Sequence, residues 1–165
     1  MEPAPRRFER TIVIHARPAR VMRAFIDHAD LAVWWQVARS VALTKPLGTY
    51  VVDWGVAETH DEVLGPLGGV FQGTVMEYRD ARELFVADAH WLPPQGLPLG
   101  PMALEVVCTA EGRGGITNLT VRQSADESSE VEEARWTRYF EVISAGWTHA
   151  LDALQRHLEA ETYRK

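Results

Sequence analysis

The chain has 165 residues, of which 46% are hydrophobic and 24% charged, and its net charge at pH 7 is -6. These values fit one globular domain, residues 1–165, and argue against a nucleic-acid partner, whose phosphates bind clustered lysine and arginine. Apolar runs are short and broken by charge, and the N-terminal residues lack the apolar stretch of a signal peptide. We therefore expect a cytoplasmic protein without a membrane span.

Cysteine and histidine usage argues against a metal centre. Cys108 is the sole cysteine, which excludes an internal disulfide and a cysteine-based zinc site and agrees with a reducing compartment. The six histidines are dispersed, and His149 and His157 are too far apart on a helix to form a ligand pair. We predict neither a metal nor a cofactor. Nucleotide-binding loops and nucleophile elbows are also missing from the sequence, so no catalytic residue is assigned.

The start of the chain predicts one strand followed by two short helices. Residues 8–16 alternate in the manner of a strand. Pro18 then opens a helix that ends near residue 28, since proline in a first helical turn loses no hydrogen bond. A second helix is predicted over residues 29–35.

This second helix carries an adjacent pair of tryptophans, Trp34 and Trp35. Neighbouring side chains on a helix point about 100° apart, so the two indoles cannot both point straight into one core. At least one should meet a groove, a loop or a ligand, unless both close the end of the core.

From residue 37 onward the hydrophobic period changes to two. Six further strands are predicted over residues 37–44, 49–57, 70–78, 84–91, 102–110 and 117–124. Short turns separate them, which favours antiparallel pairing in one curled sheet of about seven strands. The segments 65–69 and 93–101 are rich in glycine and proline and are predicted lids, whereas residues 60–62 are predicted to form a solvated turn.

Alternation within the strands predicts which side chains face the core. The inward sets are Leu104, Val106 and Cys108; Leu119 and Val121; and Tyr50, Val52 and Trp54. Residues 84–91 are ambiguous, because one face holds Phe85, Ala87, Ala89 and Trp91, and the other holds Leu84, Val86, Asp88 and His90. If the second face is inward, a carboxylate and an imidazole lie inside the domain, where each needs a hydrogen-bond partner or water.

Residues 132–159 predict one long helix. Its large apolar residues recur at gaps of three or four: Trp136, Phe140, Ile143, Trp147, Leu151, Leu154 and Leu158. No proline interrupts it, and Ser128 or Ser129 could cap its start. Such a helix would be roughly 40 Å long, so it should lie across the whole core. Gly146 either lets this helix approach the sheet or leaves room beside it.

Both ends of the chain resemble a known family. IVIHARPARVMRAF (residues 12–25) and LAVWW (residues 31–35) are similar to the first strand, proline-opened helix and tryptophan-bearing helix of the START-like, SRPBCC-type superfamily, and more narrowly of the family related to the activator of the Hsp90 ATPase. GGITNLTV (residues 114–121) and GWTHALDAL (residues 146–154) are similar to that family's Gly-turn strand and Gly-Trp helix. The proline-rich segment 93–101 departs from its pattern.

This resemblance implies an α+β helix-grip fold, in which a curved antiparallel sheet surrounds the long C-terminal helix and leaves a mostly apolar cavity between them. Relatives of the fold bind lipids, sterols or other hydrophobic molecules, cyclise polyketides, or act as co-chaperone modules. The fold alone therefore does not select one activity.

We expect a small hydrophobic or aromatic ligand under the long helix, with plain core packing as the alternative role for the aromatic residues. The predicted ligand-binding residues are Trp34, Trp54, Asp88, His90, Leu104, Val106, Phe140, Ile143 and Trp147. The sequence leaves a homodimer open.

Two other functions remain open. An enzyme related to polyketide cyclases would use Asp88 and His90 as acid-base groups, because a carboxylate beside an imidazole raises the imidazole pKa. A co-chaperone-like module would contact its partner through the basic N-terminal segment, whose arginines are otherwise expected to form a solvated face. These are Arg6, Arg7, Arg10, Arg17, Arg20 and Arg23.

Overall fold

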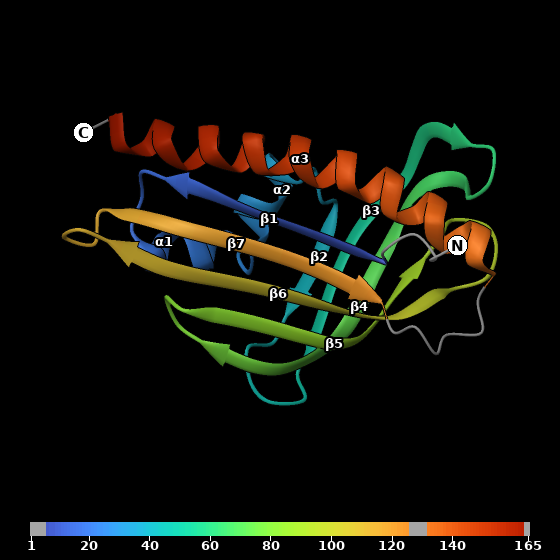
Figure 1. The fold of residues 1–165 in the computed structure, drawn as a ribbon, viewed down its shortest axis with the longest axis horizontal. Coiled ribbons are helices and arrows are strands. Elements are labelled where there is room, and N and C mark those ends of the chain that lie inside the picture. Colours follow the sequence, from blue (N-terminus) through green and yellow to red (C-terminus); the bar gives the residue numbers. More distant parts are fainter. Residues whose placement is uncertain (1–5, 126–131, 164–165) are drawn as a thin grey trace, which may run out of the picture.

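The computed structural model describes residues 6–125 and 132–163, and within it seven antiparallel strands form one curved sheet (Figure 1). The strand order is β1-β7-β6-β5-β4-β3-β2. The strands are β1 (Arg7–Ile14), β2 (Arg39–Ala42), β3 (Thr49–Asp61), β4 (Gly65–Arg79), β5 (Glu83–Leu92), β6 (Leu99–Glu111) and β7 (Ile116–Ala125). The predicted sheet is confirmed.

Three helices complete the described chain: α1 (Pro18–Arg23), α2 (His28–Trp34) and α3 (Glu133–Tyr163). The 31 residues of α3 give a rod about 46 Å long that runs the length of the sheet beside β1 (Figure 1). This is the predicted α+β helix-grip fold. The suggested caps of α3, Ser128 and Ser129, lie outside the described residues.

The first predicted helix is shorter than expected. It starts at Pro18 as predicted but ends at Arg23, and the chain turns through residues 24–26. Asp27 has an extended backbone, and its carboxylate accepts a hydrogen bond of 3.0 Å from the backbone N–H of Ala29. This N-cap starts α2 as a separate helix, as side-chain caps do for the free N–H groups of a first turn.

The β3–β4 hairpin reaches further than the sequence pattern suggested. Residues 65–69, predicted as a lid, belong to β4, and Gly68 pairs with Val56 at a backbone φ of +92°. A Cβ at Gly68 would lie 2.4 Å from the carbonyl oxygen of Gly55, so only glycine fits there. The alternation signal fails here because glycine and proline are usual in turns but are also used in irregular strands.

The hairpin turn is held by a buried carboxylate. Asp61 is 7% exposed and accepts hydrogen bonds from the backbone N–H groups of Val63 and Leu64. It also pairs with Arg138 of α3 at 2.7 Å. The prediction of a solvated turn at residues 60–62 was therefore wrong for Asp61, because a cation 77 residues away supplies its partner.

A β-bulge resolves the ambiguous strand. Leu84 and Val86 are buried, and so are Ala89 and Trp91, while the pairing of β5 with β6 shifts between Val86 and Ala89. Asp88, inside the shift, is exposed with φ +50°. An inserted residue moves all following side chains to the other face. Neither predicted face is therefore buried along its whole length.

Candidate functional site

The described residues enclose two sizeable hollows. The larger, about 1010 Å³, is an open trough between the β3–β4 turn, the segment around residues 95–101 and the start of α3, with polar residues such as His60 and Glu62 in its wall. The smaller, about 700 Å³, lies between α3, α2 and the sheet, and its wall is mostly apolar and includes seven aromatic residues, with His149 and Arg156 among the polar ones. We take the smaller hollow as the candidate site, because it is less open and buries apolar surface. From here on it is called the cavity.

Four tryptophans from three elements form one side of the cavity. Trp34 and Trp35 come from the end of α2, Trp54 from β3, and Trp147 from α3. Trp35 is the centre of the group, because its ring lies 5.0 Å from Trp34, 5.2 Å from Trp54 and 4.7 Å from Trp147 between ring centroids. These distances are typical of attractive aromatic pairs.

The two tryptophans at the end of α2 differ in burial. Trp34 is 2% exposed, packs edge-on against Phe25 and donates a hydrogen bond of 2.9 Å to the Ala24 carbonyl. Trp35 is only half-buried, and its backbone carbonyl accepts the indole N–H of Trp54 at 3.1 Å. Both rings border the cavity, with Trp34 anchored in the core behind the ring of Trp35.

A short chain of hydrogen bonds runs from Trp147 along the cavity wall. Trp147 donates from its indole nitrogen to Oε1 of Gln123 at 2.8 Å. The Gln123 amide nitrogen donates to the hydroxyl of Tyr139 at 2.9 Å and contacts the sulfur of Met102 at 3.4 Å. Burial raises the pKa of Tyr139 well above its ordinary value, against a smaller opposing effect of the Gln123 hydrogen bond, so the phenol stays protonated.

The middle of α3 forms the roof of the cavity. Ile143 and Gly146 both line it, and Ile143 is only half-buried, in contrast to the buried Trp147. A Cβ built at Gly146 meets no atom within 4 Å. Gly146 is exposed at the margin of the cavity, so of the two roles considered for this glycine the structure has the second: there is room beside the helix at this position.

The nine predicted ligand-binding residues fall into three groups, of which the last, Asp88 and His90, is described in the next paragraph. Trp34, Trp54, Ile143 and Trp147 line the cavity. Leu104, Val106 and Phe140 are buried but lie elsewhere in the core, where Phe140 stacks on Trp136 at 6.0 Å.

The acid-base pair is not in the cavity wall. Asp88 is exposed in the bulge. His90 lies between the inward-facing Ala89 and Trp91 and therefore points to the outer face, next to Gly100. The expectation that both side chains meet a substrate inside the domain was wrong, because the bulge turns the mixed face outward at this point of β5.

The sequence pattern left Trp35 as an alternative to Trp34 and did not assign four further residues of the wall: Phe71, Trp91, Gln123 and Tyr139. Trp91 lies on the apolar face of the ambiguous strand 84–91, and Phe71 lies within the predicted strand 70–78, but a strand pattern cannot place a residue at a void. Tyr139 lies four residues before Ile143 on α3, and that helical spacing was the signal available for it.

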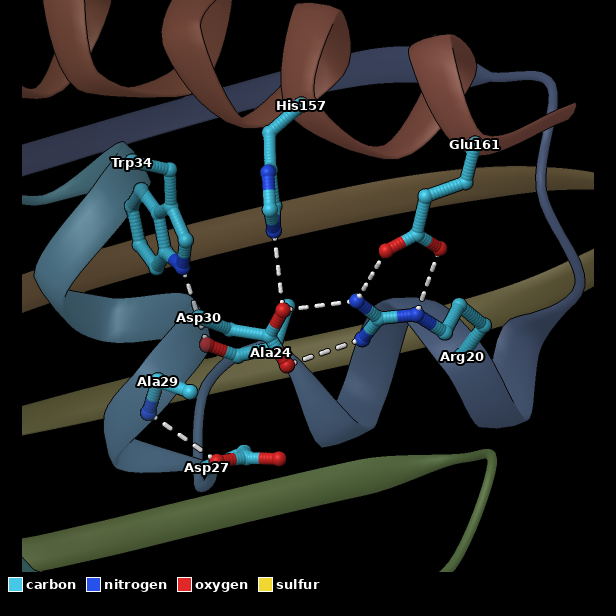
Figure 2. Close-up of polar contacts among 8 residues, drawn as sticks. All are labelled: Arg20, Ala24, Asp27, Ala29, Asp30, Trp34, His157 and Glu161. Atoms are coloured by element: carbon cyan, nitrogen blue, oxygen red, sulfur yellow. Dashed lines mark hydrogen bonds and ion pairs between the residues drawn. The ribbon is translucent and has the colours of Figure 1, made fainter. Parts of the chain in front are cut away.

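An ion network at the other end of α3 joins the three helices (Figure 2). Arg20 of α1 forms paired hydrogen bonds to Asp30 of α2, at 2.6 and 2.9 Å, and to Glu161 of α3, at 2.8 and 2.9 Å. His157 of α3 contacts the same Asp30 carboxylate at 2.8 Å. Burial acts to raise the pKa of Asp30, but the hydrogen bonds from Arg20 and His157 outweigh it and hold that pKa below its ordinary value.

Asp30, His157 and Glu161 lie close enough together to suggest a metal site. Arg20 already supplies the cation, because its guanidinium faces both carboxylates in the bidentate geometry that arginine prefers. This cluster is therefore a helix clamp, and we assign no metal to it.

The lone thiol is inert. Cys108 is 4% exposed on the inner face of β6, and burial raises its pKa to about 12. A thiol with so high a pKa carries almost no thiolate at neutral pH and is a poor nucleophile or metal ligand.

No protein-family model matches the chain, and no curated protein matches it. Solved structures do match over nearly its whole length. CV1439 from Chromobacterium violaceum is 18% identical, with a TM-score of 0.63, covering 94% of this chain and 99% of that one. A protein from Rhodobacter sphaeroides is 17% identical, with a TM-score of 0.69, covering 97% and 96%. DynU16, a protein in the dynemicin biosynthetic locus, is 20% identical, with a TM-score of 0.61, covering 94% of this chain and 48% of DynU16. At these identities the likeness establishes the helix-grip fold alone.

Among the described helices, none combines the length and the apolar character needed to cross a membrane.

Proposed function

We propose that the protein binds one small hydrophobic or aromatic molecule in the cavity between the sheet and α3. The observation that carries this proposal is the aromatic wall of a space of about 700 Å³ under the long helix. Ligand sites in proteins usually measure about 300–1,000 Å³ and combine apolar walls with a few polar groups. Gln123 and Tyr139 are polar groups of that kind here.

Thermal denaturation with a panel of aromatic compounds, including 2-acetylnaphthalene and 2-ethylnaphthalene, tests the proposal. A ligand that binds only the folded protein adds about 2.7 kcal/mol of stability at 100 times its Kd, so the melting temperature should rise with the concentration of a binding compound. The four cavity tryptophans should lose fluorescence in the same titration. A melting temperature and emission that no compound changes would overturn the proposal.

The enzyme alternative has weaker support than ligand binding. It needs Asp88 and His90 beside a substrate, and Asp88 is exposed outside the cavity. No other acid-base pair in the described part of the cavity wall takes their place.

The interaction module also has weaker support than ligand binding, because four of its six arginines already have partners among the described residues, while Arg17 and Arg23 are exposed. Arg7 pairs with Glu9 at 2.5 Å, Arg20 with Asp30, and Arg6 lies over the ring of Trp136 at 5.4 Å. The narrower placement, in the family related to the activator of the Hsp90 ATPase, is supported by the sequence motifs at the two ends of the chain. We keep it, like a cytoplasmic location and a homodimer, as a proposal.

A further inference from the structure

Hydrogen-bond donors and acceptors in the cavity wall can be assigned in sequence, starting at Trp147. An indole N–H only donates, so the atom of Gln123 that faces it must be the amide oxygen, as the 2.8 Å contact requires. The amide nitrogen of Gln123 then faces Tyr139 and donates to its hydroxyl oxygen at 2.9 Å. The reverse orientation of the amide would place two donors against each other at Trp147 and is excluded.

The hydroxyl of Tyr139 is therefore an acceptor toward Gln123, and its own hydrogen must point elsewhere. Within the described residues, Tyr139 donates no hydrogen bond to another group. The side chain is 4% exposed and lines the cavity, together with Gln123 and Trp147. A buried donor without an acceptor is costly, and a guest in the cavity can remove that cost.

We propose that Tyr139 selects the ligand: the cavity prefers aromatic or other hydrophobic molecules that carry an acceptor oxygen, such as a ketone or quinone carbonyl, placed against the Tyr139 hydroxyl. This inference rests on the proposed ligand binding and adds the chemical class of the ligand to it. A hydrocarbon of the same shape gains the same contacts with Trp35 and Trp147 but leaves the hydroxyl without an acceptor.

Two probes of nearly equal shape separate the hydroxyl from the rest of the cavity. 2-Acetylnaphthalene carries a carbonyl where 2-ethylnaphthalene carries a methylene group. Their dissociation constants are measured by tryptophan fluorescence quenching on the wild type and on Tyr139→Phe, which keeps the ring and removes only the hydroxyl. We expect the variant to bind the ketone about three- to tenfold more weakly and the hydrocarbon within about twofold of wild type, as the loss of one hydrogen bond implies.

Tyr50→Phe is the matched control. Tyr50 is 1% exposed, and its hydroxyl donates to the Phe25 carbonyl at 2.7 Å, but it does not line the cavity. This variant should keep the wild-type ratio of the two dissociation constants. The infrared carbonyl band of 2-acetylnaphthalene bound to the wild type gives a second readout that needs no variant, and it should lie at lower frequency than in hexane.

The possible results distinguish failure of the ligand-binding function from failure of the role of Tyr139. If neither probe binds the wild type, both the ligand-binding function and the role of Tyr139 are overturned. If both bind, but Tyr139→Phe leaves their ratio unchanged or weakens both equally, only the role of Tyr139 is overturned. A carbonyl band at its hexane frequency in the wild-type complex would also overturn that role, even if the variant did not fold.

Discussion

The indole nitrogen of Trp147 lies 2.8 Å from Oε1 of Gln123, so α3 and β7 are joined by a buried hydrogen bond at the edge of the cavity. Trp147 also stacks on Phe8 of β1, with ring centroids 6.1 Å apart. Trp147 therefore both packs against the sheet and holds Gln123 in the cavity wall through a hydrogen bond.

Trp147→Phe should lower the free energy of unfolding by about 1–3 kcal/mol, because it leaves the Gln123 oxygen buried without a donor. Urea denaturation measures this change. Gln123→Leu and the double variant complete the cycle, and the double variant should lose less than the sum of the two single losses. Strictly additive losses would contradict the hydrogen bond.

Two substitutions at Gly146 test stability and ligand binding separately. Gly146→Ala should stabilise the protein by about 0.5–1 kcal/mol, because alanine favours the helix and its Cβ meets open space. Gly146→Phe should remain folded but abolish quenching by 2-acetylnaphthalene, because the ring would enter the cavity.

The control for Gly146→Phe is Ala145→Phe. Ala145 is exposed, does not line the cavity, and points about 100° away from its neighbour on the helix. This variant should bind the probe as the wild type does. Equal binding by the two phenylalanine variants would show that the space beside Gly146 is not the ligand site.

Arg20→Met should destabilise the protein by roughly 3 kcal/mol, since it leaves the buried carboxylate of Asp30 and the neighbouring Glu161 without their cation. The matched control is Arg23→Met, because Arg23 is an exposed arginine on the same helix. It should change stability by less than about 0.5 kcal/mol. Similar melting temperatures for the two variants would contradict the role of the helix clamp.

Acid should weaken the clamp. The pKa values of Asp30 and Glu161 are both lowered in the folded protein by hydrogen bonds from Arg20, in Asp30 against the effect of burial. A carboxylate of this kind stabilises the fold above its unfolded pKa of about 4, and the contribution is lost as the pH falls through the folded value. The unfolding free energy should therefore fall steadily below about pH 4.

Asp30→Asn measures how much of the loss of unfolding free energy at low pH is due to the Asp30 carboxylate. Its unfolding free energy, measured by urea denaturation from pH 3 to pH 7, should fall less steeply toward low pH than that of the wild type. An Asp30→Asn profile parallel to the wild type would contradict the account.

Periodicity was enough to predict the antiparallel strands and the long helix, whereas their arrangement as a helix-grip fold was implied by the family resemblance. The gaps of three and four from Trp136 to Leu158 describe a real helix face, and the alternation around Leu104 and Leu119 describes real inward strand faces. These signals survive because each depends on many residues that bury apolar surface in the same direction.

Local irregularities and distant partners could not be predicted in this way. The bulge at Asp88 inverts the face of β5 within two residues, and no composition signal marks it. Arg20, Asp30 and Glu161 come from three helices, and each resembles an ordinary solvated charge in the sequence. Tyr139 was not assigned because it is absent from the apolar stripe of α3, and nothing in the sequence shows that its hydroxyl lies in a cavity wall.

The most direct test of the central claim is native mass spectrometry of the protein mixed with 2-acetylnaphthalene, with the wild type and Gly146→Phe measured side by side. We expect one probe molecule per wild-type chain and none on Gly146→Phe. A wild-type spectrum without the adduct, or the same adduct on both proteins, would contradict a ligand site between the sheet and α3.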